Sequence, residues 1–188
     1  VVENGAAALE LLKNAIPAGA SANTGHSTSL VVFAPFLFSL TIRVIEIGFV
    51  EHLKVQTAWD NIHGKQLAET DPAKKAALAH QGITPNYFVV GASAITKTGE
   101  IVSGDLTGTR VNGILGADNV ILLVGANKIV ADEAAGLDRL HTFCHAVESA
   151  RSRIVYKVAG SYVNNVVVVR GANPWGAPGR IHVVIVKE

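Results

Sequence analysis

The chain contains a single cysteine, Cys144, and no methionine. One thiol cannot form an internal disulfide, complete a four-ligand zinc site or hold an iron–sulfur cluster. Cys144 also falls on the apolar side of a predicted helix, which favours an inert buried thiol over a nucleophile. We therefore expect a cytoplasmic protein, since that compartment is reducing. The missing initiator methionine predicts that the chain is trimmed.

The charged residues are few and balanced. Sixteen Lys and Arg face 15 Asp and Glu, which gives a formal net charge of +1, and neither sign forms a long run. Because a polyanion needs a concentrated basic surface, we expect no nucleic-acid partner. The most apolar stretch, residues 31–45, is shorter than the ~20 residues of a bilayer span and contains Pro35 and Arg43. We expect it to pack against protein, with no membrane crossing.

Several signatures of known chemistry are absent. The chain has no G-x-G-x-x-G, no Walker A and no G-x-S-x-G pattern, which removes the main support for nicotinamide, P-loop and α/β-hydrolase functions. His141 and His145 lie one helical turn apart, but no acidic residue completes an H-E-x-x-H arrangement. We expect no metal site and no resident cofactor.

Short apolar runs rich in β-branched residues are abundant, and 49% of the 188 residues are hydrophobic. This composition predicts one compact domain over residues 1–188. Strands alternate with helices in the middle of the chain, which predicts right-handed βαβ units and a mainly parallel sheet flanked by helices. Helices are predicted over residues 3–15, 46–54, 73–80, 107–115 and 132–149. Strands are predicted over residues 20–23, 56–59, 87–92, 119–124, 154–158, 163–169 and 181–186, with a hairpin-like excursion over residues 95–102. The C-terminal strands predict a mixed or antiparallel edge.

The loops after residues 23, 92 and 124 are the predicted ligand site. In an open parallel sheet, ligands bind beyond the carboxyl ends of the strands. These loops supply small residues, hydroxyl groups, an amide and a cation that suit an anion: Gly25, Ser27, Thr28, Ser93, Thr96, Asn127 and Lys128. An equal alternative for the first loop is that its hydroxyl groups satisfy local backbone.

Asp105 and Arg110 flank a predicted helix start, with Gly108 and Thr109 between them. Arg110 can hold a carboxylate or phosphate by two contacts, and Asp105 can accept a proton or orient a substrate hydroxyl. Residue type alone favours the simpler alternative, in which Asp105 caps the helix and Arg110 pairs with it.

Three segments together carry a family resemblance. They are S-A-I-T with a following glycine at residues 93–99, D-L-T-G-T-R-V at residues 105–111, and V-G-A-N-K-I-V at residues 124–130. With I-P-A-G at residues 16–19 and the final strand, they make the chain resemble the LUD domain family of lactate utilisation proteins over nearly its whole length. Relative to that family, residues 30–45 resemble an apolar insertion. Ser93 and Thr109 stand where the family pattern has asparagine.

The resemblance implies a three-layer α/β/α fold like that of the NagB, RpiA and CoA-transferase group. It also implies a role in the oxidation of lactate to pyruvate beside iron–sulfur partner subunits. From both lines of reasoning we expect a small carboxylate or phosphorylated ligand, held by Arg110 and Lys128, with Asp105 orienting it or moving a proton. Two alternatives stay open: a non-catalytic subunit that docks on a redox partner, and a phosphosugar isomerase or folate cyclo-ligase-like enzyme. The sequence also leaves a homo-oligomer open.

Overall fold

A computed structural model describes residues 1–25, 47–176 and 178–187. Ser27, Thr28 and the apolar stretch at residues 30–45 lie outside these ranges. The larger sheet has five strands in the order β2-β1-β3-β6-β9, and every neighbouring pair is parallel. The bounds of its strands are β1 Ser21–Thr24, β2 Asp60–Asn61, β3 Tyr87–Val90, β6 Asn119–Gly125 and β9 Ile181–Val186.

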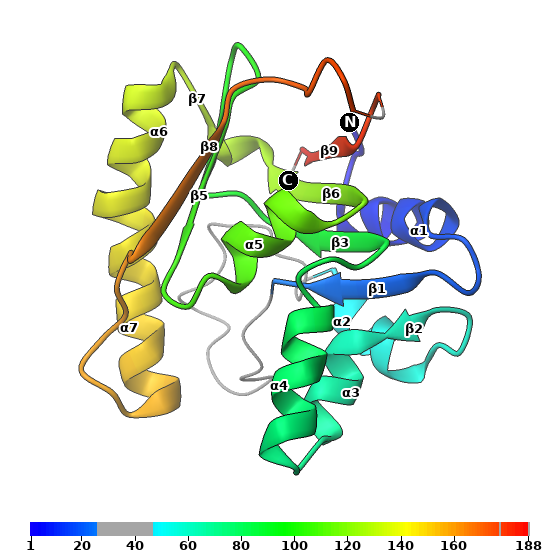
Figure 1. Cartoon of the computed structure of the whole chain (residues 1–188). Coiled ribbons are helices and arrows are strands. Elements are labelled where there is room, and N and C mark those ends of the chain that lie inside the picture. The colour runs from blue at the N-terminus through cyan, green and yellow to red at the C-terminus, as the bar shows by residue number, and fades with distance from the viewer. Residues whose placement is uncertain (26–46, 177, 188) are drawn as a thin grey trace.

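Helices cover both faces of this sheet (Figure 1). Side chains alternate along a strand, so one apolar run fills two cores. Val89 and Leu123 face a core that includes α1 (Gly5–Ala15) and α2 (Phe49–Val55), whereas Phe88 and Leu122 face a core that includes α5 (Thr109–Gly116). The mainly parallel three-layer α/β/α arrangement that we predicted is therefore confirmed.

A second, smaller sheet lies beside the first, which the sequence did not predict. It has the order β7-β4-β5-β8, with bounds β4 Ala94–Thr96, β5 Ile101–Asp105, β7 Ile129–Val130 and β8 Asn165–Val169. Strands β4 and β5 form the expected hairpin, and β8 pairs antiparallel with β5. The helical unit α6 (Glu133–Arg139), η2 (Leu140–Cys144) and α7 (His145–Tyr156) packs on this sheet through Leu140. Figure 1 shows α6 and α7 as one long helix beside β8.

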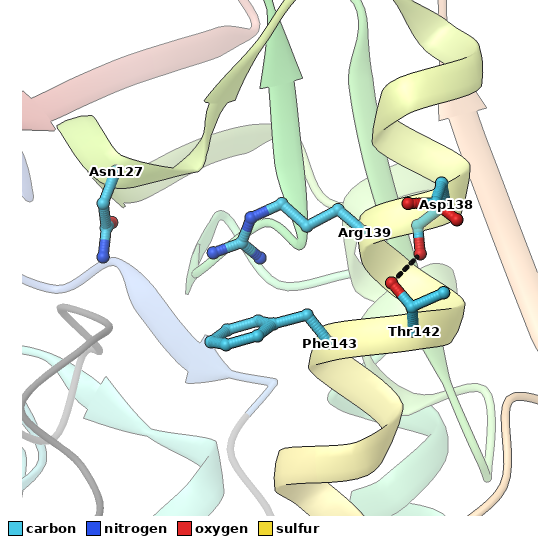
Figure 2. A pocket seen from close by; sticks show the side chains of 5 residues that line it. All are labelled: Asn127, Asp138, Arg139, Thr142 and Phe143. Carbon is cyan, nitrogen blue, oxygen red and sulfur yellow. Dashed lines mark hydrogen bonds between the residues drawn. The ribbon is translucent and has the colours of Figure 1, made fainter.

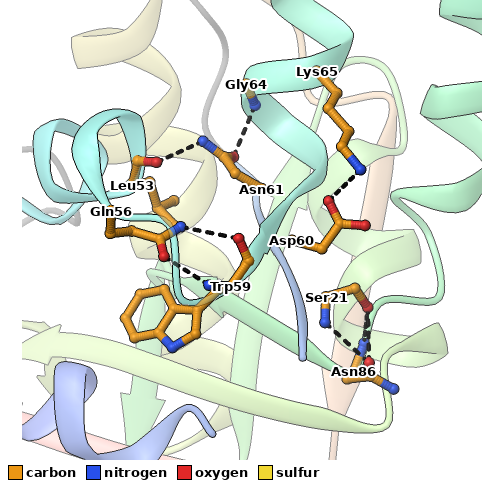
Figure 3. Close-up of polar contacts among 9 residues, drawn as sticks. All are labelled: Ser21, Leu53, Gln56, Trp59, Asp60, Asn61, Gly64, Lys65 and Asn86. Carbon is orange, nitrogen blue, oxygen red and sulfur yellow. Dashed lines mark hydrogen bonds and ion pairs between the residues drawn. The ribbon is translucent and has the colours of Figure 1, made fainter. Parts of the chain in front are cut away.

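The predicted strand at residues 56–59 is wrong, because this segment is a turn closed by a side chain. The side chain of Gln56 donates to the carbonyl of Trp59 and accepts from its N–H, as Figure 3 shows. The strand follows as β2 and leads into α3 (Ile62–Ala68). The side chain of Asn61 caps this helix by accepting from the N–H of Gly64. The next helix, α4 (Pro72–Gln81), begins at the predicted cap, since Asp71 accepts from two backbone N–H groups.

The predicted strand at residues 154–158 is also wrong. Helix α7 continues through Tyr156 and ends at Lys157, which adopts a left-handed conformation with φ of 58°. A short apolar run does not distinguish a strand from the last turn of a helix by periodicity. Here Cζ of Arg151, five residues earlier, lies 5.1 Å from the centre of the Tyr156 ring, and Arg151 donates to the Tyr156 hydroxyl. These contacts stabilise the helical form.

Candidate functional site

The candidate site lies at the carboxyl ends of β1, β3 and β6, which are neighbours in the larger sheet. Gly25 follows β1 directly and lies against the start of α5. A Cβ atom at Gly25 would lie 2.9 Å from a methyl of Val90, 3.0 Å from the ring of Phe88 and 3.4 Å from Cα of Arg110. Only glycine fits this position without displacement, and the loop after β1 is thereby held close to Arg110.

Asp105 ends β5 and organises the entry to α5. One carboxylate oxygen accepts from the N–H of Gly108 and from Nδ2 of Asn165, and the other accepts from the N–H groups of Arg110 and Val111. Gly108 takes the left-handed conformation, with φ of 84°, that lets the chain turn back over the carboxylate. The capping contact weighed from the sequence is therefore present.

Arg110 does not pair directly with Asp105 through its side chain. Its Nη1 atom donates to the carbonyl of Gly104 at 3.1 Å. Its Nε atom is buried, and no group among the described residues accepts a hydrogen bond from it. Burial lowers the pKa of Arg110, while Glu148 and Asp105 nearby favour the charged form. The site thus holds a desolvated guanidinium whose Nε–H has no acceptor within the described part of the chain.

Lys128 supplies a second cation at the same edge, and this one is buried. It lies in the 3-10 turn η1 (Ala126–Lys128) after β6 and is only 5% exposed. Its Nζ atom lies 3.7 Å from the position that a Cβ atom would take at Gly91, just after β3. The preceding residue, Asn127, is exposed, so the two neighbours differ in their access to solvent.

The other predicted residues divide between the site and its surroundings. Ser93 is 5% exposed, and its carbonyl accepts from Arg139 at 2.8 Å. Thr96 is buried in the β4–β5 turn, where its hydroxyl accepts from the N–H groups of Gly99 and Glu100. Thr109 is exposed in the first turn of α5. Thr96 therefore serves the hairpin, whereas Ser93 borders the candidate site.

Sequence reasoning did not identify Arg139. This residue and Phe143 lie on the α6–η2 unit and line an open hollow of about 410 Å³, together with Asn127, Asp138 and Thr142. Figure 2 shows the guanidinium of Arg139 extending toward Asn127, above the ring of Phe143. The distance from Cζ of Arg139 to the ring centre is 4.8 Å. The only signal in the sequence was the spacing of four residues between Arg139 and Phe143, which places two side chains on one face of a helix but is common in helices.

Cys144 and the described histidines do not group into a metal-binding cluster. Cys144 is half-buried with Sγ 2.9 Å from Nη1 of Arg139, and Nε2 of His145 lies 2.8 Å from the carbonyl of Ser161. Within the described ranges, no three His, Cys, Asp or Glu side chains are grouped closely enough to bind a metal ion. None of the helices in those ranges has the length and apolarity needed to cross a membrane.

Comparison with known proteins gives the family. One solved structure that resembles the chain is that of a DUF162 family protein from Deinococcus radiodurans, with 16% sequence identity and a TM-score of 0.37. The similarity covers 57% of this chain and 57% of that one, less than two thirds of either. No curated protein matches the chain. The model of the LUD domain matches residues 1–186, and the chain therefore belongs to the LUD domain family.

Proposed function

We propose that this LUD-domain protein is a component of the oxidation of lactate, a 2-hydroxy acid, to pyruvate, and that it binds the acid in an anion cleft at the carboxyl edge of the larger sheet. The observation that carries the proposal is the buried Nε atom of Arg110, which lacks an acceptor among the described residues. A desolvated cation with an unused donor gains free energy when an anion binds to it.

Arg110 and Lys128 hold the anion in this proposal. Lys128 is buried, and Arg110 is half-buried with a buried Nε atom. The attraction of such charges to an anion is stronger where water is excluded. In this proposal Asp105 orients the ligand or moves a proton. Its hydrogen bonds from the backbone hold the start of α5, and with it Arg110, in place. The remaining members of the proposed site are Gly25, Ser27, Thr28, Ser93, Gly108, Thr109 and Asn127.

Oxidation of lactate to pyruvate releases two electrons and two protons. The chain has one cysteine, too few for a cluster, so we propose that iron–sulfur partner subunits in the cytoplasm accept the electrons. In this arrangement the chain binds and orients the acid, and the partner carries the redox group. A tagged chain recovered from its source lysate should bring down a lactate-dependent activity that reduces a dye.

Calorimetric titration of the purified chain with lactate, pyruvate and sugar phosphates tests the anion site. We expect lactate or pyruvate to bind, and Arg110→Ala to weaken that binding at least tenfold, because a charge-assisted hydrogen bond contributes about 1.5–3 kcal/mol. Arg153→Ala is the matched control, since Arg153 is an exposed arginine on α7.

Two outcomes contradict the proposal. Equal binding of lactate or pyruvate by the Arg110→Ala variant excludes Arg110 as the anion holder. Binding of sugar phosphates alone favours an isomerase or cyclo-ligase-like enzyme in place of lactate oxidation.

A further inference from the structure

The guanidinium of Arg139 is held in a fixed orientation by three neighbours. Its Nη1 atom donates to the carbonyl of Ser93 at 2.8 Å and to Sγ of Cys144 at 2.9 Å, and its plane lies over the ring of Phe143. Nη1 carries two hydrogens, so these two acceptors use both of them. An arginine fixed at one end in this way presents the rest of its fork without further loss of side-chain freedom.

The π-helical turn η2 makes this arrangement possible. Its backbone includes a hydrogen bond from the N–H of His145 to the carbonyl of Leu140, five residues earlier. In an α-helix, with about 3.6 residues per turn, the position five residues after Arg139 is rotated by about 140° around the helix axis from it. The wider turn places Phe143 and Cys144 beside Arg139 at the same time. Single π turns of this kind occur frequently at functional sites.

The opposite edge of the guanidinium faces the hollow. Among the residues that the structure describes, neither Nε nor Nη2 of Arg139 has a recorded hydrogen-bond acceptor. These two atoms present parallel N–H groups, a geometry that matches the two oxygens of a carboxylate. Figure 2 shows this end of Arg139 directed toward Asn127 across the hollow.

We propose that the hollow between Asn127 and Phe143 is a carboxylate site in which Arg139 binds a flat 2-oxo acid by two-point contact through Nε and Nη2. The identity of the acid rests on the proposed function, whereas the carboxylate site rests on the geometry of Arg139. The half-buried ring of Phe143 forms an apolar wall for the carbon chain of the ligand, and the amide of Asn127 lies across from the fork.

The charges around the hollow select for one carboxylate. Among the described residues that line the hollow, Arg139 is the only cation, and the exposed carboxylate Asp138 lies at the rim. A second carboxylate on the ligand would lie near Asp138, and no lining cation would neutralise it. The two negative charges would therefore repel each other. Monocarboxylates such as pyruvate should therefore bind more tightly than dicarboxylates such as 2-oxoglutarate.

The test uses the full chain and two measurements. Calorimetry compares pyruvate, acetate, 2-oxoglutarate and inorganic phosphate, and ¹⁵N NMR follows the arginine Nε–H signals during the pyruvate titration. Arg139→Lys keeps the positive charge but lacks the fork, so it should weaken pyruvate binding about tenfold or more. The Arg139 Nε–H signal is missing from the spectrum of Arg139→Lys, so the variant also identifies which signal of the wild type belongs to Arg139. Arg153→Lys, an exposed exchange on α7, is the matched control.

The outcomes separate this inference from the proposed function. Pyruvate binding that is at least about tenfold weaker in Arg139→Lys, with an Nε–H shift at Arg139 in the wild type, supports the site even if lactate oxidation is absent. Unchanged affinity in Arg139→Lys, or preference for 2-oxoglutarate, overturns it while an Arg110-dependent site still stands. If Arg139→Lys fails to fold, the Nε–H signal is assigned to Arg139 in the wild type through bonds to its side-chain carbons. No shift of that signal with saturating pyruvate then refutes the site.

Discussion

Helix α5 approaches β3 so closely at Gly113 that a single methyl group should measurably destabilise the fold. A Cβ atom at Gly113 would lie 2.3 Å from Cζ and 2.4 Å from Cε1 of Phe88, whose side chain is fully buried. Atoms cannot approach this closely, so Phe88 or the helix must move in a densely packed core. Gly113→Ala therefore tests the contact that positions the start of α5, and with it Arg110.

Two terms set the expected size of the effect. Overpacking of this kind costs typically 1–3 kcal/mol, and the shortest distance here places Gly113→Ala at the upper end. Alanine is favoured over glycine in a helix by about 1 kcal/mol, which offsets part of the cost. We expect a net loss of about 2 kcal/mol in the free energy of unfolding, or a fall in Tm of roughly 4–8 °C.

Urea unfolding followed by circular dichroism measures this loss. Gly171→Ala is the control, because no atom lies within 4 Å of the position that its Cβ would take. Phe88→Leu removes the clashing ring, so the double variant should be at least ~1 kcal/mol more stable than the sum of the single effects predicts. A Gly113→Ala variant as stable as the wild type, or strictly additive effects, would refute the packing argument.

Two further predictions concern single polar residues. Asp105→Ala should lower the free energy of unfolding by about 2–3 kcal/mol because three backbone N–H groups lose their acceptor, and Asp105→Asn, which keeps one oxygen, should cost about half as much. Urea unfolding checks both variants. A free energy of unfolding equal to that of the wild type in both would contradict the capping role. Burial, with a smaller effect from Lys54, lowers the pKa of His63 below 6.5. The unfolded chain therefore takes up the proton first, and stability should fall as pH drops below 6.5 until the folded-state pKa is reached. His63→Gln should show a smaller fall in Tm between pH 7 and 5; an identical fall would exclude His63 as the cause.

Much of the larger sheet was predictable because its signals are local. β3 and β6 are continuous apolar runs that a parallel sheet buries on both faces, and Asp71 before Pro72 marks the start of α4. The expectation that ligand-binding loops follow these strands also needed only the class of sheet. The two incorrect strands, at residues 56–59 and 154–158, were short segments whose apolar character suits a turn or helix end equally well.

The sequence by itself determined the α/β class, the family, the capping residue Asp105 and the cations Arg110 and Lys128, because each depends on residue type and spacing along the chain. Only the tertiary structure decided that β8 pairs with β5 in a second sheet, and that Arg139 contacts Ser93, 46 residues away in the chain. Such contacts depend on which surfaces pack together once the whole chain has folded, and no local pattern encodes them. The π turn beside Arg139 belongs to the same group, since the packing of Leu140 against Val102 and Gly104 of β5 accompanies it.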